Sequence, residues 1–143
     1  MIEVRESRGG FRVTVSGRRA RLARDGTVRL VYLAPRAVVK VSEFDRGRQN
    51  RSEAAALRSP LVRREALLAG VVLPRLLAVG PGYDWIAVSR LALRRPRVGE
   101  RRRADMFARV ARVMAAADRH DYDPGYWNWA VVGGWPAIYD LGV

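Results

Sequence analysis

The chain has 143 residues, enough for one domain or for one compact domain of two small lobes. Because it has no cysteine and only one histidine, a disulfide framework and a thiolate metal site are excluded, and any bound metal would have to use oxygen ligands. No apolar run approaches the roughly 18 to 20 residues of a membrane span or follows a basic start as in a signal peptide, so we expect a cytoplasmic protein without a transmembrane segment.

The net charge of +13 predicts an anionic partner, which could be an acidic or phosphorylated substrate, a protein or nucleic acid. The arginines are scattered, however, and such a preference for arginine also arises in GC-rich genomes. Lys40 is the only lysine among 27 basic side chains. One explanation is that a single lysine has persisted by chance in a chain whose composition otherwise favours arginine. The other is a site that needs a compact ammonium rather than a planar guanidinium, which makes Lys40 a candidate functional residue.

The first half of the chain has the alternation of apolar and polar residues that is typical of a sheet. Three such segments, separated by turn residues, predict an antiparallel meander: residues 10–17, 26–33 and 36–44. Helical segments follow at 51–58 and 59–72, with Ser59 as the N-cap and Pro60 in the first turn. Two further strands are predicted as a hairpin, at residues 75–80 and 85–93.

The second half of the chain is predicted to be mainly helical. An arginine-rich connection at 94–103 leads into a helix at 104–120. The apolar stripe of that helix predicts a core face made of Met106, Val110, Val113 and Met114. A short hairpin, 128–132 with 136–142, ends the chain. We therefore expect an α+β fold, with a five-stranded antiparallel sheet and an inserted helix in residues 1–93 and a reduced helical lobe in residues 94–143.

Several polar residues occupy informative places in this frame. Lys40 lies in the middle of an apolar strand, and Glu65 lies in a following helix, close to a face formed by Leu61, Leu68 and Val72. The loop before the last hairpin contains Asp123 and Asn128, which are five positions apart, and Asp140 ends the final strand before Leu141 and Gly142.

In this order and with these separations, the chain resembles the protein-kinase-like superfamily over nearly its whole length. In that family a lysine on the third strand binds the α- and β-phosphates of ATP and pairs with a glutamate on the next helix. The resemblance assigns Lys40 in AVVKV to the first role. It assigns Glu65 to the second, because Glu65 precedes a proline and the fourth strand at about the family distance. Glu53 is the competitor, but Pro60 would interrupt a helix that reached from Glu53 to the fourth strand.

The family's catalytic loop has the pattern His-Arg-Asp, four residues, Asn. By resemblance Asp123 is the base and Asn128 is a metal ligand, and Asp140 in YDLG chelates magnesium, so ATP and Mg²⁺ are the expected cofactors. The alternative base is Asp121, if DYDPG corresponds to the Asp-Leu-His-Pro-Gly-Asn form of small-molecule and atypical kinases. His120 lies one position too early for the family pattern.

The sequence departs from the family at two points. Between the first two predicted strands, only Gly17 and Gly26 are available for a glycine-rich phosphate loop, and their spacing is wrong. The chain also stops one residue after Asp-Leu-Gly, where a protein kinase continues into the segment that binds protein substrates. We therefore expect either a truncated kinase or a minimal one, similar to the Kdo and lipopolysaccharide core kinase-like families of bacteria and phages.

The resemblance implies an ATP- and Mg²⁺-dependent phosphotransferase that acts on a hydroxyl of a protein or a sugar. A pseudokinase whose basic surface binds a partner is the alternative, and a basic nucleic-acid-binding module that uses the aromatic residues of GYWNW is the third hypothesis. We also expect association into a homodimer through the helix segment 107–117, because a reduced lobe would leave apolar helix surface uncovered.

Overall fold

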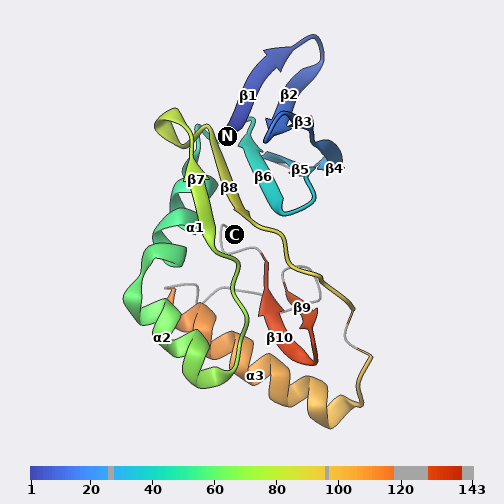
Figure 1. Ribbon diagram of the computed structural model, residues 1–143. Coiled ribbons are helices and arrows are strands. Elements are labelled where there is room, and N and C mark those ends of the chain that lie inside the picture. The colour runs from blue at the N-terminus through green and yellow to red at the C-terminus, as the bar shows by residue number, and fades with distance from the viewer. Residues whose placement is uncertain (26–27, 96, 118–128, 140–143) are drawn as a thin grey trace. The chain divides into compact units, whose positions relative to one another are not determined.

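The structure is a computed structural model, and it describes all residues except 26–27, 96, 118–128 and 140–143 (Figure 1). The chain forms two compact units. The first unit comprises residues 1–54 and 75–90, and the second comprises residues 55–74 and 91–143. Each unit is thus made of two separate stretches of chain. No described helix is both long enough and apolar enough to cross a membrane.

A five-stranded antiparallel sheet dominates the first unit, as the sequence predicts for an α+β fold. Its strand order is β4-β5-β6-β8-β7, so β6 is the central strand. The strands are β4 (Arg21–Asp25), β5 (Arg29–Leu33), β6 (Ala37–Ser42), β7 (Leu76–Val79) and β8 (Trp85–Ser89). A short 3-10 turn, η1 (Pro81–Tyr83), joins β7 to β8.

The first strand of the expected meander does not join this sheet. Residues 10–17 instead contribute to a small separate sheet, whose strands are β1 (Ile2–Ser7), β2 (Gly10–Val15) and β3 (Arg18–Arg19). Ser16 and Gly17 have positive φ values of 51° and 75°, and this tight turn folds the chain back from β2 onto β3. The fifth strand of the main sheet is therefore β4, which has little alternation of apolar and polar residues and was not predicted.

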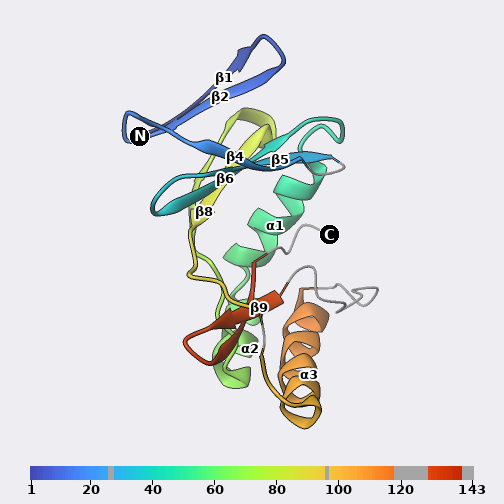
Figure 2. The same cartoon turned by 90° about the vertical axis from the view of Figure 1, so that its right-hand side faces the viewer.

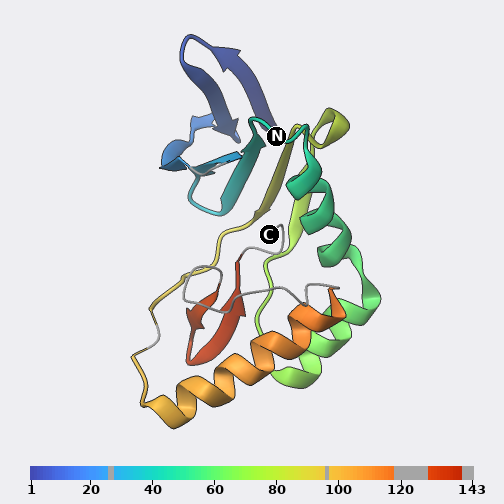
Figure 3. The same cartoon turned by 180° about the vertical axis from the view of Figure 1, so that it is seen from behind.

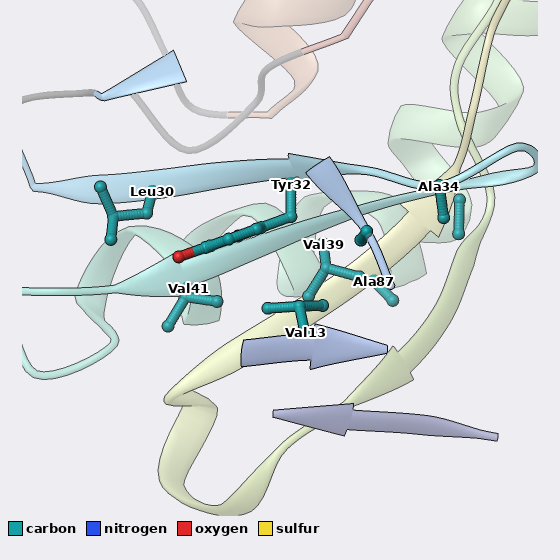
Figure 4. Close-up of a cluster of buried hydrophobic side chains, with 9 residues drawn as sticks. Val13, Leu30, Tyr32, Ala34, Val39, Val41 and Ala87 are labelled. Carbon is teal, nitrogen blue, oxygen red and sulfur yellow. The ribbon is translucent and has the colours of Figure 1, made fainter. Parts of the chain in front are cut away.

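The hydrophobic core of the first unit lies between the two sheets. Side chains of β5 and β6 point toward Val13 of β2, and Figure 4 shows Tyr32, Val39 and Val41 among them. In Figure 2 the small sheet lies beside β4 and β5. Because side chains alternate along a strand, Lys40 projects from the opposite face of β6, away from this core. That alternation places the candidate lysine on the face opposite the small sheet.

The predicted break in the helical region is confirmed. The helices are α1 (Arg48–Arg58) and α2 (Pro60–Ala69), and the Ser59 hydroxyl accepts a hydrogen bond of 3.3 Å from the backbone N–H of Val62. Gly70 closes α2 in the left-handed conformation, with φ 66°.

The buried face of α2 is made of small residues. This face consists of Val62, Ala66 and Ala69, whereas Leu61 and Leu68 of the face noted in the sequence are exposed. Small side chains allow α2 to pack closely on α3 (Glu100–Ala116), and the two helices lie side by side in Figures 1 and 3.

The apolar stripe of α3 is buried, as predicted, at Met106, Val110, Val113 and Met114. The final hairpin is also confirmed, with strands β9 (Trp129–Val132) and β10 (Trp135–Ile138). Gly133 and Gly134 form its two-residue turn, and both have positive φ values, 56° and 84°. Association into a homodimer through residues 107–117 remains a prediction.

Candidate functional site

The best-defined polar site in the described residues centres on Lys40. Its Nζ donates a hydrogen bond of 2.6 Å to Oε1 of Glu53, which lies near the middle of α1. Lys40 is 4% exposed and Glu53 is completely buried. Helix α1 begins shortly after β6 ends and brings Glu53 to the face of the sheet from which Lys40 projects. A buried lysine and glutamate on successive elements therefore form a direct ion pair.

This pairing corrects the expectation that Glu65 would be the partner of Lys40. Glu65 lies on α2 in the second unit, where its Oε2 accepts a hydrogen bond of 2.5 Å from Nε of Arg112 on α3. The Arg112 side chain is about half exposed. Pro60 would interrupt a helix that reached from Glu53 to the fourth strand, and this is the ground on which the sequence favours Glu65. The chain instead uses two helices, and only the first of them carries a carboxylate to Lys40.

A second cation, which was not predicted, contacts the same carboxylate. Arg29 donates through one terminal nitrogen to Glu53 Oε2 at 2.7 Å and to Asn50 Oδ1 at 3.2 Å. Arg29 is opposite Ser42 in the β5–β6 register and Val31 is opposite Lys40, so Arg29 and Lys40 lie on one face of the sheet. Each oxygen of the Glu53 carboxylate therefore accepts a hydrogen bond from a different buried cation.

Asn50 connects this cluster to the backbone. Its side-chain amide donates to the carbonyl oxygen of Lys40 at 3.3 Å and to that of Tyr83 at 2.9 Å. Asn50 and Glu53 are three residues apart on α1, a spacing that places both on one helix face. Two features of the sequence could have indicated the cluster. Asn50 and Glu53 have a helical spacing, and Arg29 lies two positions before Val31, the residue opposite Lys40.

The start of α1 is held in place by Asp45. Its carboxylate accepts hydrogen bonds from the hydroxyl of Ser42 at 2.6 Å and from the backbone N–H groups of Gly47 and Gln49 at 3.1 and 2.8 Å. Partial burial raises the pKa of Asp45, whereas the hydrogen bond from Ser42 lowers it. The backbone donors of Gln49 and Gly47 lower it further, and the balance leaves the pKa of Asp45 below its ordinary value of 3.8.

Gly47 permits a close approach of two backbone segments. It has a φ of 76°, and a Cβ at this position would lie 2.7 Å from the carbonyl oxygen of Tyr83 and 2.8 Å from that of Gly82. Arg51 of the first turns of α1 also lies over the ring of Tyr83, 5.2 Å from its centroid. The position of α1, and hence of Glu53, is thus set by contacts with the turn before β8.

The chemistry of this cluster suits the binding of an anion. Burial of a charged group is costly unless it is paired, and Glu53 pairs with both Lys40 and Arg29 inside the protein. An ammonium has three N–H donors, so a lysine that is held by one carboxylate can also donate to a second anion, such as a phosphate. The ammonium of Lys40 is therefore held in one orientation before any anion binds.

The remaining predicted site residues lie outside the described part of the structure. They are Asp123, Asn128 and Asp140, together with Asp121 and His120. Among the described residues, no group of three or more side chains of the metal-binding types is placed to hold an ion. The expected magnesium ligands Asn128 and Asp140 remain predictions from the resemblance.

Comparison with known proteins finds no family model that matches the chain and no curated protein whose sequence matches it. A function for this chain is therefore inferred from its own residues.

Proposed function

We propose that this chain is an ATP- and Mg²⁺-dependent phosphotransferase of kinase-like fold that acts on a hydroxyl acceptor. The observation that carries the proposal is the 2.6 Å pair between Lys40 Nζ and Glu53 Oε1. Lys40 lies on β6, which is third along the chain among the five strands of the main sheet, and Glu53 lies on the helix that directly follows. A third-strand lysine paired with a glutamate of the next helix is required for activity in protein kinases.

In this proposal Lys40 binds the α- and β-phosphates of ATP, and Glu53 holds its ammonium in position. Phosphoryl transfer needs positioned charge rather than a covalent nucleophile, because negative charge is spread over the phosphate oxygens in the transition state. A lysine that is oriented before the substrate binds does not lose side-chain freedom at that moment. Burial strengthens this effect, since fewer water molecules screen the charge.

The roles of the other residues follow the resemblance. Asp123 would orient the acceptor hydroxyl, with Asp121 as the alternative. Asn128 and Asp140 would hold Mg²⁺, and their amide and carboxylate oxygens are the kinds of ligand that Mg²⁺ prefers. Mg²⁺, when bound, neutralises charge on the phosphate oxygens.

The test is calorimetric titration of the folded protein with Mg²⁺ and a non-hydrolysable ATP analogue. We expect metal-dependent binding that Lys40→Ala and Asp140→Asn each weaken by about tenfold or more, since a hydrogen bond to a charged group contributes about 1.5–3 kcal/mol. Lys40→Ala should remain folded, because Arg29 still pairs with Glu53 in that variant.

Glu65→Gln is the matched control for Glu53→Gln. Both changes remove one helix carboxylate, but only Glu53 contacts Lys40, so only Glu53→Gln should weaken nucleotide binding. If the folded wild type binds no nucleotide at millimolar concentration, the phosphotransferase proposal is wrong. If it binds nucleotide but phosphorylates neither protein nor sugar hydroxyls, the pseudokinase alternative takes its place.

A further inference from the structure

A cavity of about 570 Å³ lies in the first unit, beside the small sheet. Its lining includes Tyr32 of β5, whose side chain projects from the face of the main sheet opposite to Lys40, because Tyr32 and Val31 are neighbours on one strand. The volume is in the range of small-ligand sites, about 300–1,000 Å³. This cavity is therefore separate from the Lys40–Glu53 pair.

Three arginines line the cavity: Arg8, Arg19 and Arg21. All three side chains are exposed, and no acidic residue is part of the lining. Within the described portion of the chain, no carboxylate forms an ion pair with any of the three. Among the described residues the three arginines thus have no ion-pair partner, although Glu6 lies opposite Phe11 on the same face of the hairpin.

The β1–β2 hairpin presents one of these arginines at its tip. Ser7 pairs with Gly10, so Arg8 and Gly9 form a two-residue turn in which Gly9 has a φ of 81°. The half-buried ring of Phe11 lies next to this turn in the lining of the cavity. A charged tip and an aromatic side chain are thus adjacent on one wall.

The basic surface continues onto the outer face of the hairpin. Arg5 is directly opposite Arg12 in the β1–β2 register, and both side chains are exposed. Like charges directly opposite on paired strands are unfavourable, and among the described residues the ion pair of Arg5 with Glu3, at 3.4 Å, is the one formed by these two arginines. The protein therefore maintains a run of arginines here at some cost in stability.

We propose that this cavity binds the phosphodiester backbone of single-stranded nucleic acid. Successive phosphates match a run of arginines, and a guanidinium can form two parallel hydrogen bonds to one phosphate. The guanidinium groups, and the part of the Phe11 ring that is not packed against the core, offer surfaces on which unpaired bases stack. An acidic peptide would match the charges but would leave these stacking surfaces without use.

The experiment is fluorescence anisotropy with a labelled single-stranded oligonucleotide of about 15 nucleotides, titrated at several salt concentrations. The test variant combines Arg8→Gln, Arg19→Gln and Arg21→Gln. We expect its affinity to fall by about tenfold or more, and the slope of log affinity against log salt to decrease by about two. Circular dichroism melting checks that the variant is folded, which we expect because the three side chains are exposed.

The matched control removes the same three charges elsewhere, by Arg63→Gln, Arg64→Gln and Arg101→Gln, at exposed positions of α2 and α3. It should bind within about threefold of the wild type. Equal losses in the two variants, or no binding by the wild type at low salt, would overturn the proposal. The proposal would also be overturned if polyglutamate competed as strongly as unlabelled oligonucleotide, because that result would identify an acidic protein as the partner.

Discussion

At the scale of single residues, the central finding is a carboxylate shared by two buried cations. Lys40 and Arg29 donate to different oxygens of Glu53, and all three side chains are almost completely buried. The short distance from Nζ to Oε1 suits a compact ammonium at position 40, next to a guanidinium that already occupies the other oxygen. This arrangement gives a physical reason for the only lysine in a chain otherwise rich in arginine.

The two helix glutamates should differ greatly in their effect on stability. Glu53→Gln leaves two buried cations without their common anion, and we expect the free energy of unfolding to fall by about 3–5 kcal/mol. Glu65→Gln removes a pair with a half-exposed arginine and should cost at most about 1 kcal/mol. Urea denaturation of both variants measures the difference. Similar small losses would mean that Glu53 is not buried between the two cations in solution.

At the scale of elements, helix α1 determines the site because it is tied at its start to two neighbouring segments. Asp45 binds backbone N–H groups at the beginning of the helix, and Asn50 binds the backbone of β6 and of the turn before β8. Gly47 leaves no room for a side chain at the same place. These contacts set the rotation of α1 and thereby direct Glu53 toward the sheet.

Asp45 should make this anchoring dependent on pH. Its pKa is lowered in the folded protein, so its contribution to stability is present above the unfolded pKa, near 3.8, and is lost as the pH falls through the lower folded pKa. We expect Asp45→Ala to cost about 0.5–2 kcal/mol at about pH 7, as for side chains that accept from the first backbone N–H groups of a helix, and much less at an acidic pH below the folded pKa. Chemical denaturation at the two pH values measures this change.

Glu43→Ala is the control for that experiment, because it removes an exposed carboxylate two positions away. It should leave the free energy of unfolding within about 0.5 kcal/mol at both pH values. If Asp45→Ala lowers the free energy of unfolding equally at neutral and acidic pH, the charge of the carboxylate does not contribute to stability.

At the scale of the whole molecule, strong positive charge coexists with exposed apolar side chains. The net charge is +13, while Leu67 is 83% exposed and Leu68 is 59% exposed. Both leucines line a cavity of about 640 Å³ beside α2 and α3, with Trp135 of β10. Repulsion between copies opposes contact through this surface at low salt.

We predict that self-association increases with salt, because added ions shorten the range of repulsion from about 10 Å at 0.1 M to about 3 Å at 1 M. Light scattering should show a rising mean mass, and Leu67→Gln with Leu68→Gln should suppress the rise. Phe44→Gln is the control, because it removes an exposed aromatic residue from the first unit, and it should leave the rise in mean mass unchanged. A constant monomer mass at every salt concentration would contradict the prediction.

The sequence by itself determined the features that depend on local chemistry. Ser59 and Pro60 start α2, Gly133 and Gly134 form the turn of the last hairpin, and the stripe of α3 faces a core. Each of these follows from the conformational limits of a few adjacent residues or from a helical period. The position of Lys40 within a buried strand could be predicted for the same reason.

Only the tertiary structure decided which residues meet. It paired Lys40 with Glu53 rather than Glu65, added Arg29 and Asn50 to the site, and placed β4 rather than residues 10–17 in the main sheet. The spacing of residues along the chain is compatible with several helix rotations and strand pairings. The packing of α1 against the sheet, and of the small sheet over the core, selects one arrangement, in which the core side chains are buried and Glu53 is paired with Lys40 and Arg29.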